Sequence, residues 1–236
     1  MAIYRIADLN IDIQYSHRYL DNLCKNYLAE NQNVKADFAV FPIQEDVEKD
    51  RKVLDESHYP TPYLESLSVY RQIARKILEY DGIILHASVV EMDGKAYAFT
   101  APSGTGKSTH CRLWLEAFPE KARIINGDKP LIRYIDGKLY AYGTPWCGKE
   151  NYNVNTKAEL CSICFINRGQ ENVIKQIDKN EAVKKIFTQL LLPETNAQTD
   201  SFFNMLAVMC DKVKFYSLQC NMDLDAALTA YEGMKE

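Results

Sequence analysis

The sequence predicts an α/β fold built on a mixed β-sheet, because its strand patterns are joined both by tight turns and by helices. Alternating β-rich runs meet at Asp93-Gly94 and at Asp136-Gly137, dipeptides that two-residue hairpin turns favour. The first hairpin, Val89 to Thr100, leads through a short loop into a helical pattern. Hairpins pair strands antiparallel and helical crossovers pair them parallel, so both directions are expected in one sheet.

Residues 1–62 are predicted to form a small N-terminal α+β elaboration. Ile3 to Ile13 alternates apolar and polar residues and is predicted to be one outer strand, and Asp37 to Phe41 is predicted to be another. A helical pattern lies between them. The densely charged segment Glu45 to Lys52 is either a solvated loop or an exposed helix face.

Residues 63–236 are predicted to form the main domain, which opens on apolar residues at helical spacing. We interpret this stripe as core packing and not as a binding surface. It consists of Tyr63, Leu67, Tyr70, Ala74 and Ile77.

The rest of the main domain continues the alternation of strands and helices. Strands are expected at Ala122 to Ile125, Leu160 to Asn167 and Val213 to Gln219. A helix is expected over Glu181 to Leu192, ending before a proline. A last helix follows the final strand, and its predicted cap is Asp223 or Asp225.

Composition limits the classes of partner. The chain has 236 residues, enough to bury a full core, and its net charge of −4 argues against a nucleic-acid surface or a binder of anionic membranes. No apolar run is long enough to span a bilayer, and Arg5 and Asp8 stand where a secretory segment would be apolar. We expect a cytoplasmic protein without nucleic-acid or membrane partners. The sequence leaves open whether it forms a homo-oligomer.

The cysteines indicate reduced thiols. There are seven, an odd number without a regular framework. Cys161 and Cys164 form the single close pair, inside a run that looks like a strand, and neither a second pair nor a neighbouring histidine completes a zinc set. We interpret them as core residues.

The segment from Phe99 to Thr109 reads F-T-A-P-S-G-T-G-K-S-T and has the composition of a phosphate-binding loop. Backbone N–H groups can converge on phosphate oxygens only where side chains are small, and Gly104 and Gly106 supply that freedom. The pattern departs from the usual motif because Ala101 replaces its first glycine. The alternative is a Gly/Ser turn that binds no ligand.

The residues that close the loop carry its charge chemistry. Lys107 is expected to place a positive charge at the β- and γ-phosphates, and the Ser108 hydroxyl is the expected ligand of Mg²⁺. A helix that begins here would point its positive end at the phosphates. The predicted ATP-binding residues are Ser103, Gly104, Thr105, Gly106, Lys107, Ser108 and Thr109.

Asp128 follows the strand Ala122 to Ile125 in the run I-I-N-G-D-K-P. An acid at the end of a strand next to such a loop is placed for Mg²⁺ binding or for general-base catalysis. The alternative is a turn aspartate beside a glycine and a proline.

Further candidates lie on either side of this acid. His86 interrupts a strand pattern and is either a core histidine or part of a site. The aperiodic segment Tyr142 to Asn155 has the composition of a shaped loop. Within it, Lys149 could neutralise a transferring phosphoryl group and Glu150 could serve as a carboxylate for metal or base; both could equally be solvated charges.

Together these runs resemble a known family. H-A-S-V-V-E-M-D-G-K-A-Y-A-F-T-A-P-S-G-T-G-K-S-T-H, I-N-G-D-K-P and Y-G-T-P-W-C-G-K are similar to the HPr kinase-like branch of the P-loop kinases, whose fold is related to phosphoenolpyruvate carboxykinase. More narrowly, they resemble the HPr kinase-like proteins of bacterial peptide-biosynthesis clusters. The resemblance spans Ile83 to Asn155, and the tail Phe215 to Tyr231 is also similar. It implies a mixed-sheet P-loop kinase core.

The resemblance also implies roles and exposes two departures. It makes Asp128 the acid near metal and acceptor and raises His86 to an active-site neighbour. Those families carry two consecutive acids at this strand end, whereas the first position here is Gly127, so Glu150 is a candidate for the missing carboxylate. The long glycine-rich C-terminal motif of true HPr kinases has no counterpart, which makes HPr a doubtful substrate.

These observations predict a kinase that uses ATP and Mg²⁺ to phosphorylate a Ser or Thr hydroxyl of a peptide or small protein, with the loop Gly143 to Asn155 helping to seat the acceptor. Two other functions stay open. One keeps the site but has a small-molecule hydroxyl as acceptor. The other is a non-catalytic nucleotide-binding regulator in which the missing acid has cost activity.

Overall fold

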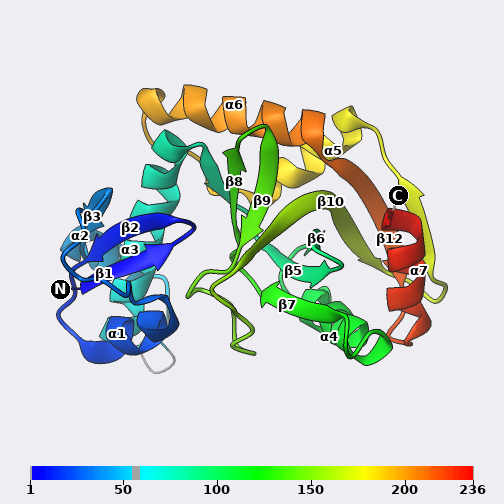
Figure 1. Cartoon of the computed structure of the whole chain (residues 1–236), viewed down its shortest axis with the longest axis horizontal. Coiled ribbons are helices and arrows are strands. Elements are labelled where there is room, and N and C mark those ends of the chain that lie inside the picture. The colour runs from blue at the N-terminus through cyan, green and yellow to red at the C-terminus, as the bar shows by residue number, and fades with distance from the viewer. Residues whose placement is uncertain (1, 55–58, 236) are drawn as a thin grey trace.

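A computed structural model describes residues 2–54 and 59–235 as a mixed α/β protein. Figure 1 shows a small N-terminal unit beside a larger body in which a curled sheet lies between helices. The two chain ends lie on opposite sides of the molecule (Figure 1). The division of the chain at residue 62 stays a prediction.

The N-terminal unit is a three-stranded sheet in the order β1-β2-β3 with helices packed on it. Its strands are β1 (Ala2–Ile6), β2 (Leu9–Ile13) and β3 (Phe38–Val40). Its helices are α1 (Arg18–Cys24), η1 (Lys25–Tyr27), α2 (Gln44–Arg51), α3 (Thr61–Lys76) and η2 (Ile77–Tyr80).

The prediction of one strand over Ile3 to Ile13 was wrong. The chain turns back at Ala7 and Asp8, both of which have positive φ, and β1 and β2 pair as a hairpin. Aspartate tolerates this backbone, and the Asp8 carboxylate is held from outside by the Tyr142 hydroxyl at 2.8 Å and the Lys157 ammonium at 2.6 Å. The turn therefore also ties the N-terminal unit to the main body.

The interpretation of the α3 stripe as core was half wrong. Ala74 and Ile77 are buried with the N-terminal sheet. Tyr63, Leu67 and Tyr70 are only half-buried and line a cavity. Helical periodicity correctly placed these residues on one face of α3, but it did not reveal that part of this face lines a cavity.

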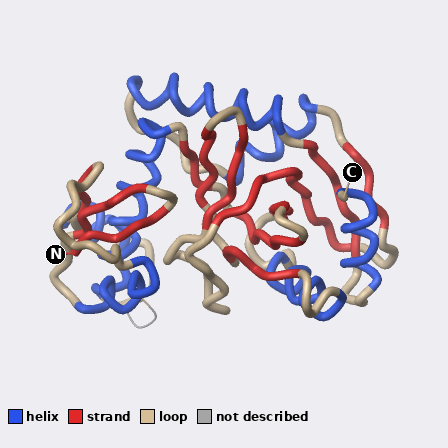
Figure 2. Tube along the Cα trace, in the orientation of Figure 1, coloured by secondary structure: helices blue, strands red, loops and turns tan. Residues whose placement is uncertain are grey.

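The main sheet runs in the order β4-β8-β9-β10-β6-β5-β7, with β12 also beside β10 and β11 beside β12. Figure 2 shows how strongly this sheet curls. Both predicted hairpins, β5–β6 and β8–β9, are confirmed. The strands are β4 (Gly82–Ile84), β5 (Ala87–Met92), β6 (Lys95–Thr100), β7 (Ala122–Asn126), β8 (Leu131–Ile135), β9 (Lys138–Tyr142), β10 (Lys157–Arg168), β11 (Val173–Gln176) and β12 (Lys214–Cys220).

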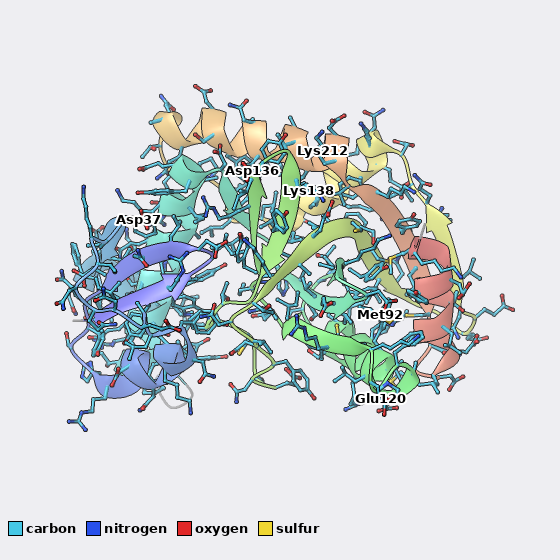
Figure 3. The ribbon with its side chains drawn as sticks, in the orientation of Figure 1. Asp37, Met92, Glu120, Asp136, Lys138 and Lys212 are labelled. Atoms are coloured by element: carbon cyan, nitrogen blue, oxygen red, sulfur yellow. The ribbon has the colours of Figure 1, made fainter. Side chains whose placement is uncertain are left out.

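Helices cover both faces of this sheet. Alternate residues of β6 point to opposite sides: Ala96 and Ala98 face a core shared with α5 and α6, whereas Tyr97 and Phe99 face a core shared with α4 and α7. Figure 3 labels Asp136 and Lys138 at the tip of the β8–β9 hairpin, and α6 contacts β9. These helices are α4 (Lys107–Ala117), α5 (Lys179–Ile186), α6 (Asn196–Lys212) and α7 (Asp225–Met234), and the short η3 (Phe187–Gln189) follows α5.

Strand direction assembles the site. β6 and β10 are parallel, and β5 pairs antiparallel with both β6 and β7, so β6, β7 and β10 all point the same way. Their carboxyl ends meet at one edge of the sheet, together with the beginning of β5. The glycine-rich loop after Thr100, the turn at Asp128 and the residue His86 are thus brought to one place.

Three further predictions need correction. Helix α6 was missed, because polar residues fill its first turns and hide its period. The helix predicted over Glu181 to Leu192 ends at Ile186 and continues only as a 3-10 turn. The N-cap of α7 is Leu224 and not Asp223 or Asp225, and no side chain caps this helix. The Asp223 carboxylate accepts a hydrogen bond from the Asn221 side-chain amide instead.

Cys164 is fully buried in the core and Cys161 is half-buried. Within residues 2–54 and 59–235, no helix has the length and apolarity that crossing a bilayer would take.

Candidate active site

The glycine-rich loop has the backbone that its glycines require. Gly104 and Gly106 have φ of +77° and +124°, and no atom lies within 4 Å of where a Cβ would stand on either. The requirement is therefore conformational and not one of space, and any L side chain here would be strained. Ala101 is buried in the core, so a methyl group in place of the first glycine is accommodated.

Lys107 begins helix α4 and is buried, with 8% of its surface exposed. Its Nζ donates to the carbonyl oxygen of Ala101 at 2.9 Å, across the loop. Burial lowers the pKa of Lys107, while the nearby Asp128 carboxylate acts in the opposite direction. Within residues 2–54 and 59–235, Ala101 is the one hydrogen-bond partner of this ammonium, which therefore retains donors for an anion.

Asp128 is held by the residue two before it. The Asn126 side chain accepts from the backbone N–H groups of Asp128 at 2.9 Å and Lys129 at 2.7 Å, and it donates to Thr144. The Ser88 hydroxyl donates to the carbonyl oxygen of the intervening glycine. All of these contacts are buried or partly so, and they fix the backbone that carries the carboxylate.

The charge of Asp128 is set by its neighbours. Burial alone would raise the pKa of Asp128. The hydrogen bond from His86 and the positive charges of Lys129, His86 and Lys107 lower it by more, so the pKa of this carboxyl lies below its usual value. His86 Nε2 is 3.2 Å and Lys129 Nζ is 3.6 Å from Oδ1. Asp128 is therefore ionised at neutral pH.

His86 lies between β4 and β5, not inside a strand as predicted. Its backbone N–H donates to Gln189, and its Nδ1 lies 3.1 Å from the Gln189 side-chain oxygen. Both ring nitrogens therefore face oxygen atoms, one of them on Asp128. The arrangement orients the ring toward the carboxylate.

Gly127 lies where a side chain would collide with the loop that follows β9. A Cβ here would stand 2.6 Å from the carbonyl oxygen of Cys147, and the Gly127 N–H donates to the Tyr152 carbonyl at 2.8 Å. Real Cβ atoms essentially never come so close to backbone oxygen. The backbone of this loop therefore occupies the space that a second acid would need.

The same loop brings its own acid to the site. Gly148 turns the chain with a φ of +83°. A Cβ on Gly148 would stand 3.2 Å from the Asp128 Cβ and 3.7 Å from Glu150 Oε2, so both acids lie next to this glycine. Lys149 and Glu150 are both exposed, and both line the cavity described next.

A cavity of about 440 Å³, here the phosphate cavity, collects these groups. Every residue that the sequence singled out for the site lines it, except Thr105. Its lining is His86, Ser103, Gly104, Gly106, Lys107, Ser108, Thr109, Gly127, Asp128, Gly148, Lys149 and Glu150.

A second cavity of about 640 Å³, the apolar cavity, lies on the other side of the loop and shares Gly104, Gly106 and Thr109 with the first. Thr105 lines this one, together with side chains from the ends of β10 and β12. Arg168, which sequence reasoning missed, donates to the carbonyl oxygens of Gly104 and Thr105. In the sequence, the one indication of this role is that Arg168 directly follows the predicted strand Leu160 to Asn167.

A third cavity of about 430 Å³, the aromatic cavity, shares Asp128, Gly148 and Lys149 with the phosphate cavity. It lies between helices α1 and α3 of the N-terminal unit and the loop after β9. Sequence reasoning missed its aromatic wall, which is made of Tyr19, Tyr63, Tyr70 and Trp146.

The oxygen groups at the phosphate cavity suit a hard cation. Mg²⁺ is commonly held by one or two carboxylates and completed by water and substrate phosphates. The Ser108 hydroxyl and the carboxylates of Asp128 and Glu150 match that donor set. Within the described part of the chain, no group of three or more His, Cys, Asp or Glu residues could hold a metal by itself.

Comparison with known proteins gives little beyond the geometry. No protein-family model matches the chain, and no curated protein does. Among solved structures, an Hpr(Ser) kinase/phosphatase from Coxiella burnetii is similar at 11% identity and a TM-score of 0.31, over 52% of this chain and 93% of that one. A similarity this low establishes neither a shared fold nor a shared activity.

Proposed function

We propose that the chain is an ATP- and Mg²⁺-dependent kinase that transfers the γ-phosphoryl group to a Ser or Thr hydroxyl of a peptide or small protein. One observation carries the proposal: a loop with two left-handed glycines and a buried lysine shares a cavity with an ionised aspartate held by a histidine. Phosphoryl transfer needs this combination of a phosphate cradle, positive charge and an oriented acid.

The nucleotide would lie across the glycine-rich loop. Its phosphates belong in the phosphate cavity, where the positive end of α4 and Lys107 face them. Its base and ribose belong in the apolar cavity, which the loop separates from the charged side. Arg168 would stabilise the glycine-rich loop through its hydrogen bonds to the carbonyl oxygens of Gly104 and Thr105.

Ser108, Asp128 and Glu150 would hold the metal ion, and Mg²⁺ would supply neutralisation of the phosphate charge. Lys107 and Lys149 add positive charge at the same cavity. Because Gly127 leaves no space for a second acid at the strand end, Glu150 takes over that role from the neighbouring loop.

Asp128 would accept the proton of the acceptor hydroxyl. The hydroxyl oxygen forms a bond to the γ-phosphorus as the bond to the bridging oxygen of ADP breaks, and the proton passes to the Asp128 carboxylate. The lowered pKa keeps this carboxylate ionised, and His86 orients it. Since such a transition state is loose, positioning and charge account for most of the catalysis.

The test is incubation of the purified protein with Mg²⁺, ATP and a library of Ser- and Thr-containing peptides, followed by intact mass spectrometry. We expect peptides to gain the mass of one phosphate as an equal amount of ADP appears. Tight ATP binding with no transfer to any peptide, and transfer to small hydroxyl compounds instead, would contradict the peptide acceptor. Absence of ATP binding would contradict the kinase altogether.

A further inference from the structure

We propose that the aromatic cavity selects acceptors by an apolar side chain next to the phosphorylated hydroxyl, so that the substrate is a peptide with a large apolar residue adjacent to its Ser or Thr. This inference rests on the proposed kinase function and adds its specificity. The cavity is built jointly by α1, α3 and the loop after β9.

Position makes this cavity the acceptor side. It shares Asp128, Gly148 and Lys149 with the phosphate cavity, so a group in it is next to the proposed base. The apolar cavity lies on the far side of the glycine-rich loop, and Asp128 is not part of its lining. Of the two cavities that Asp128 lines, the aromatic cavity is therefore the one that the phosphates of the nucleotide would leave free for an acceptor.

The wall of the cavity is suited to a ring or a branched aliphatic group. Tyr70 and Trp146 pack with ring centroids 5.6 Å apart, and Tyr19 and Tyr63 pack edge to face at 6.4 Å. Leu23, Leu67 and Pro145 complete the apolar part. Aromatic rings of this kind bind apolar side chains through large contact areas with little loss of conformational freedom.

The hydroxyl groups of the same tyrosines favour a peptide over a purely apolar ligand. Those of Tyr19, Tyr63 and Tyr70 have no hydrogen-bond partner within residues 2–54 and 59–235. Because these hydroxyls are open to water, a ligand that fills the cavity must replace their hydrogen bonds to water. Backbone amide groups on either side of an acceptor residue would supply these bonds.

Among residues 2–54 and 59–235, the charged residues that line the cavity lie at one end of it. Asp128, Lys129 and Lys149 lie where it joins the phosphate cavity, and the described residues at the aromatic end carry no charge. Opposite charges at the first end suit the reacting hydroxyl and phosphate. A charged neighbour residue at the aromatic end would lose its hydration without a partner.

The experiment measures binding first and transfer second. Acetylated pentapeptides carry one Ser with Phe, Leu, Gly, Lys or Glu beside it, on either side, in an otherwise glycine background. Their binding to the wild-type protein without nucleotide is followed by the fluorescence of Trp146, and Trp146→Phe shows which part of the signal comes from this ring. Trp114, the other tryptophan, lies on the buried face of α4, outside the cavity lining.

We expect the Phe and Leu peptides to bind about tenfold more tightly than the Gly peptide, the size of effect that apolar pocket contacts give. Tyr63→Ala and Leu67→Ala should remove this preference, and Tyr63→Phe should keep it while weakening all peptides. Leu228→Ala, on the exposed face of α7, is the matched control and should change nothing. Thermal unfolding checks that each variant is folded.

Equal binding of the Gly and Phe peptides, or a preference for Lys or Glu, would overturn the inference. The outcome is separable from the proposed function because binding requires no transfer. An apolar preference without phosphorylation would preserve this specificity and contradict the kinase. Phosphorylation that does not depend on the residue beside the Ser would support the kinase and contradict the proposed specificity.

Discussion

The two halves of the candidate site are built in different ways. The phosphate side comes mainly from one continuous segment, Ala101 to Thr109, whose backbone conformation demands glycine at fixed places. The proposed acceptor side, the aromatic cavity, is assembled from α1, α3 and the loop after β9, which lie far apart in the chain. A conformational demand leaves a mark in the sequence, whereas a wall assembled by tertiary packing leaves only ordinary aromatic residues.

The largest effect should come from the phosphate half. Lys107→Ala removes the buried ammonium and should lower phosphoryl transfer about a thousandfold or more, since it deletes a preorganised charge at the transferring group. Steady-state kinetics and ATP titration measure this. Lys121→Ala, an exposed lysine beyond α4, is the control. If Lys107→Ala transfers phosphate at the wild-type rate, the glycine-rich loop is not part of the active site.

Helix α4, which carries the loop, should make stability depend on pH. His110 is buried and its Nε2 accepts from Trp114 Nε1 at 3.1 Å, and burial lowers its pKa to about 4 from 6.5. The unfolded chain therefore binds the proton first, so the free energy of unfolding should fall as pH drops from 6.5 toward 4. The loss is about 3 kcal/mol.

Denaturant unfolding at several pH values, compared with His110→Gln, isolates this contribution. The variant should show a smaller decrease over the same pH window. If the two proteins lose stability in parallel between pH 6.5 and 4, His110 is not the group responsible.

The junction between the halves can be tested at Gly127. Gly127→Ala places a methyl group against the Cys147 carbonyl, and it should cost about 1–3 kcal/mol of stability as the loop is displaced. Activity should fall with it, because Glu150 moves with that loop. Thermal unfolding and kinetics are the measurements. A fully stable, fully active variant would show that the loop does not pack here.

The smallest of these effects concerns the loop acid. Glu150→Gln keeps the size of the side chain but removes its charge, and it should raise the Mg²⁺ concentration for half-maximal activity about tenfold, the effect typical of a lost metal-orienting group. Glu120→Gln, exposed after α4, is the control. An unchanged Mg²⁺ dependence would leave Asp128 as the single protein carboxylate in the site.

The sequence predicted what is local and missed what is assembled. The β5–β6 and β8–β9 hairpins and the loop before α4 were predicted because Asp-Gly turns and glycine spacing are chemical requirements of short segments. Asp128 was predicted from the end of a strand, but Asn126, which fixes its backbone, was not, because an asparagine beside a glycine is common in turns.

The parts that were not predicted depend on distant contacts. Tyr63 and Tyr70 share the apolar period of core residues, and only the packing of α3 against the loop after β9 makes them line a cavity. Likewise, nothing in the residues around Gly127 reveals that the carbonyl group of Cys147 lies against it. Such facts belong to the tertiary structure.

Asp128 joins the two halves, so its substitution tests the account most directly. The measurement is the rate of phosphate gain by a Phe-Ser pentapeptide, followed by intact mass spectrometry, for the wild type and for Asp128→Asn, with the Kd for ATP determined in parallel. We expect transfer about a hundredfold slower or more, the usual contribution of a general base, with ATP binding still detectable. Equal rates in the two proteins would contradict the account.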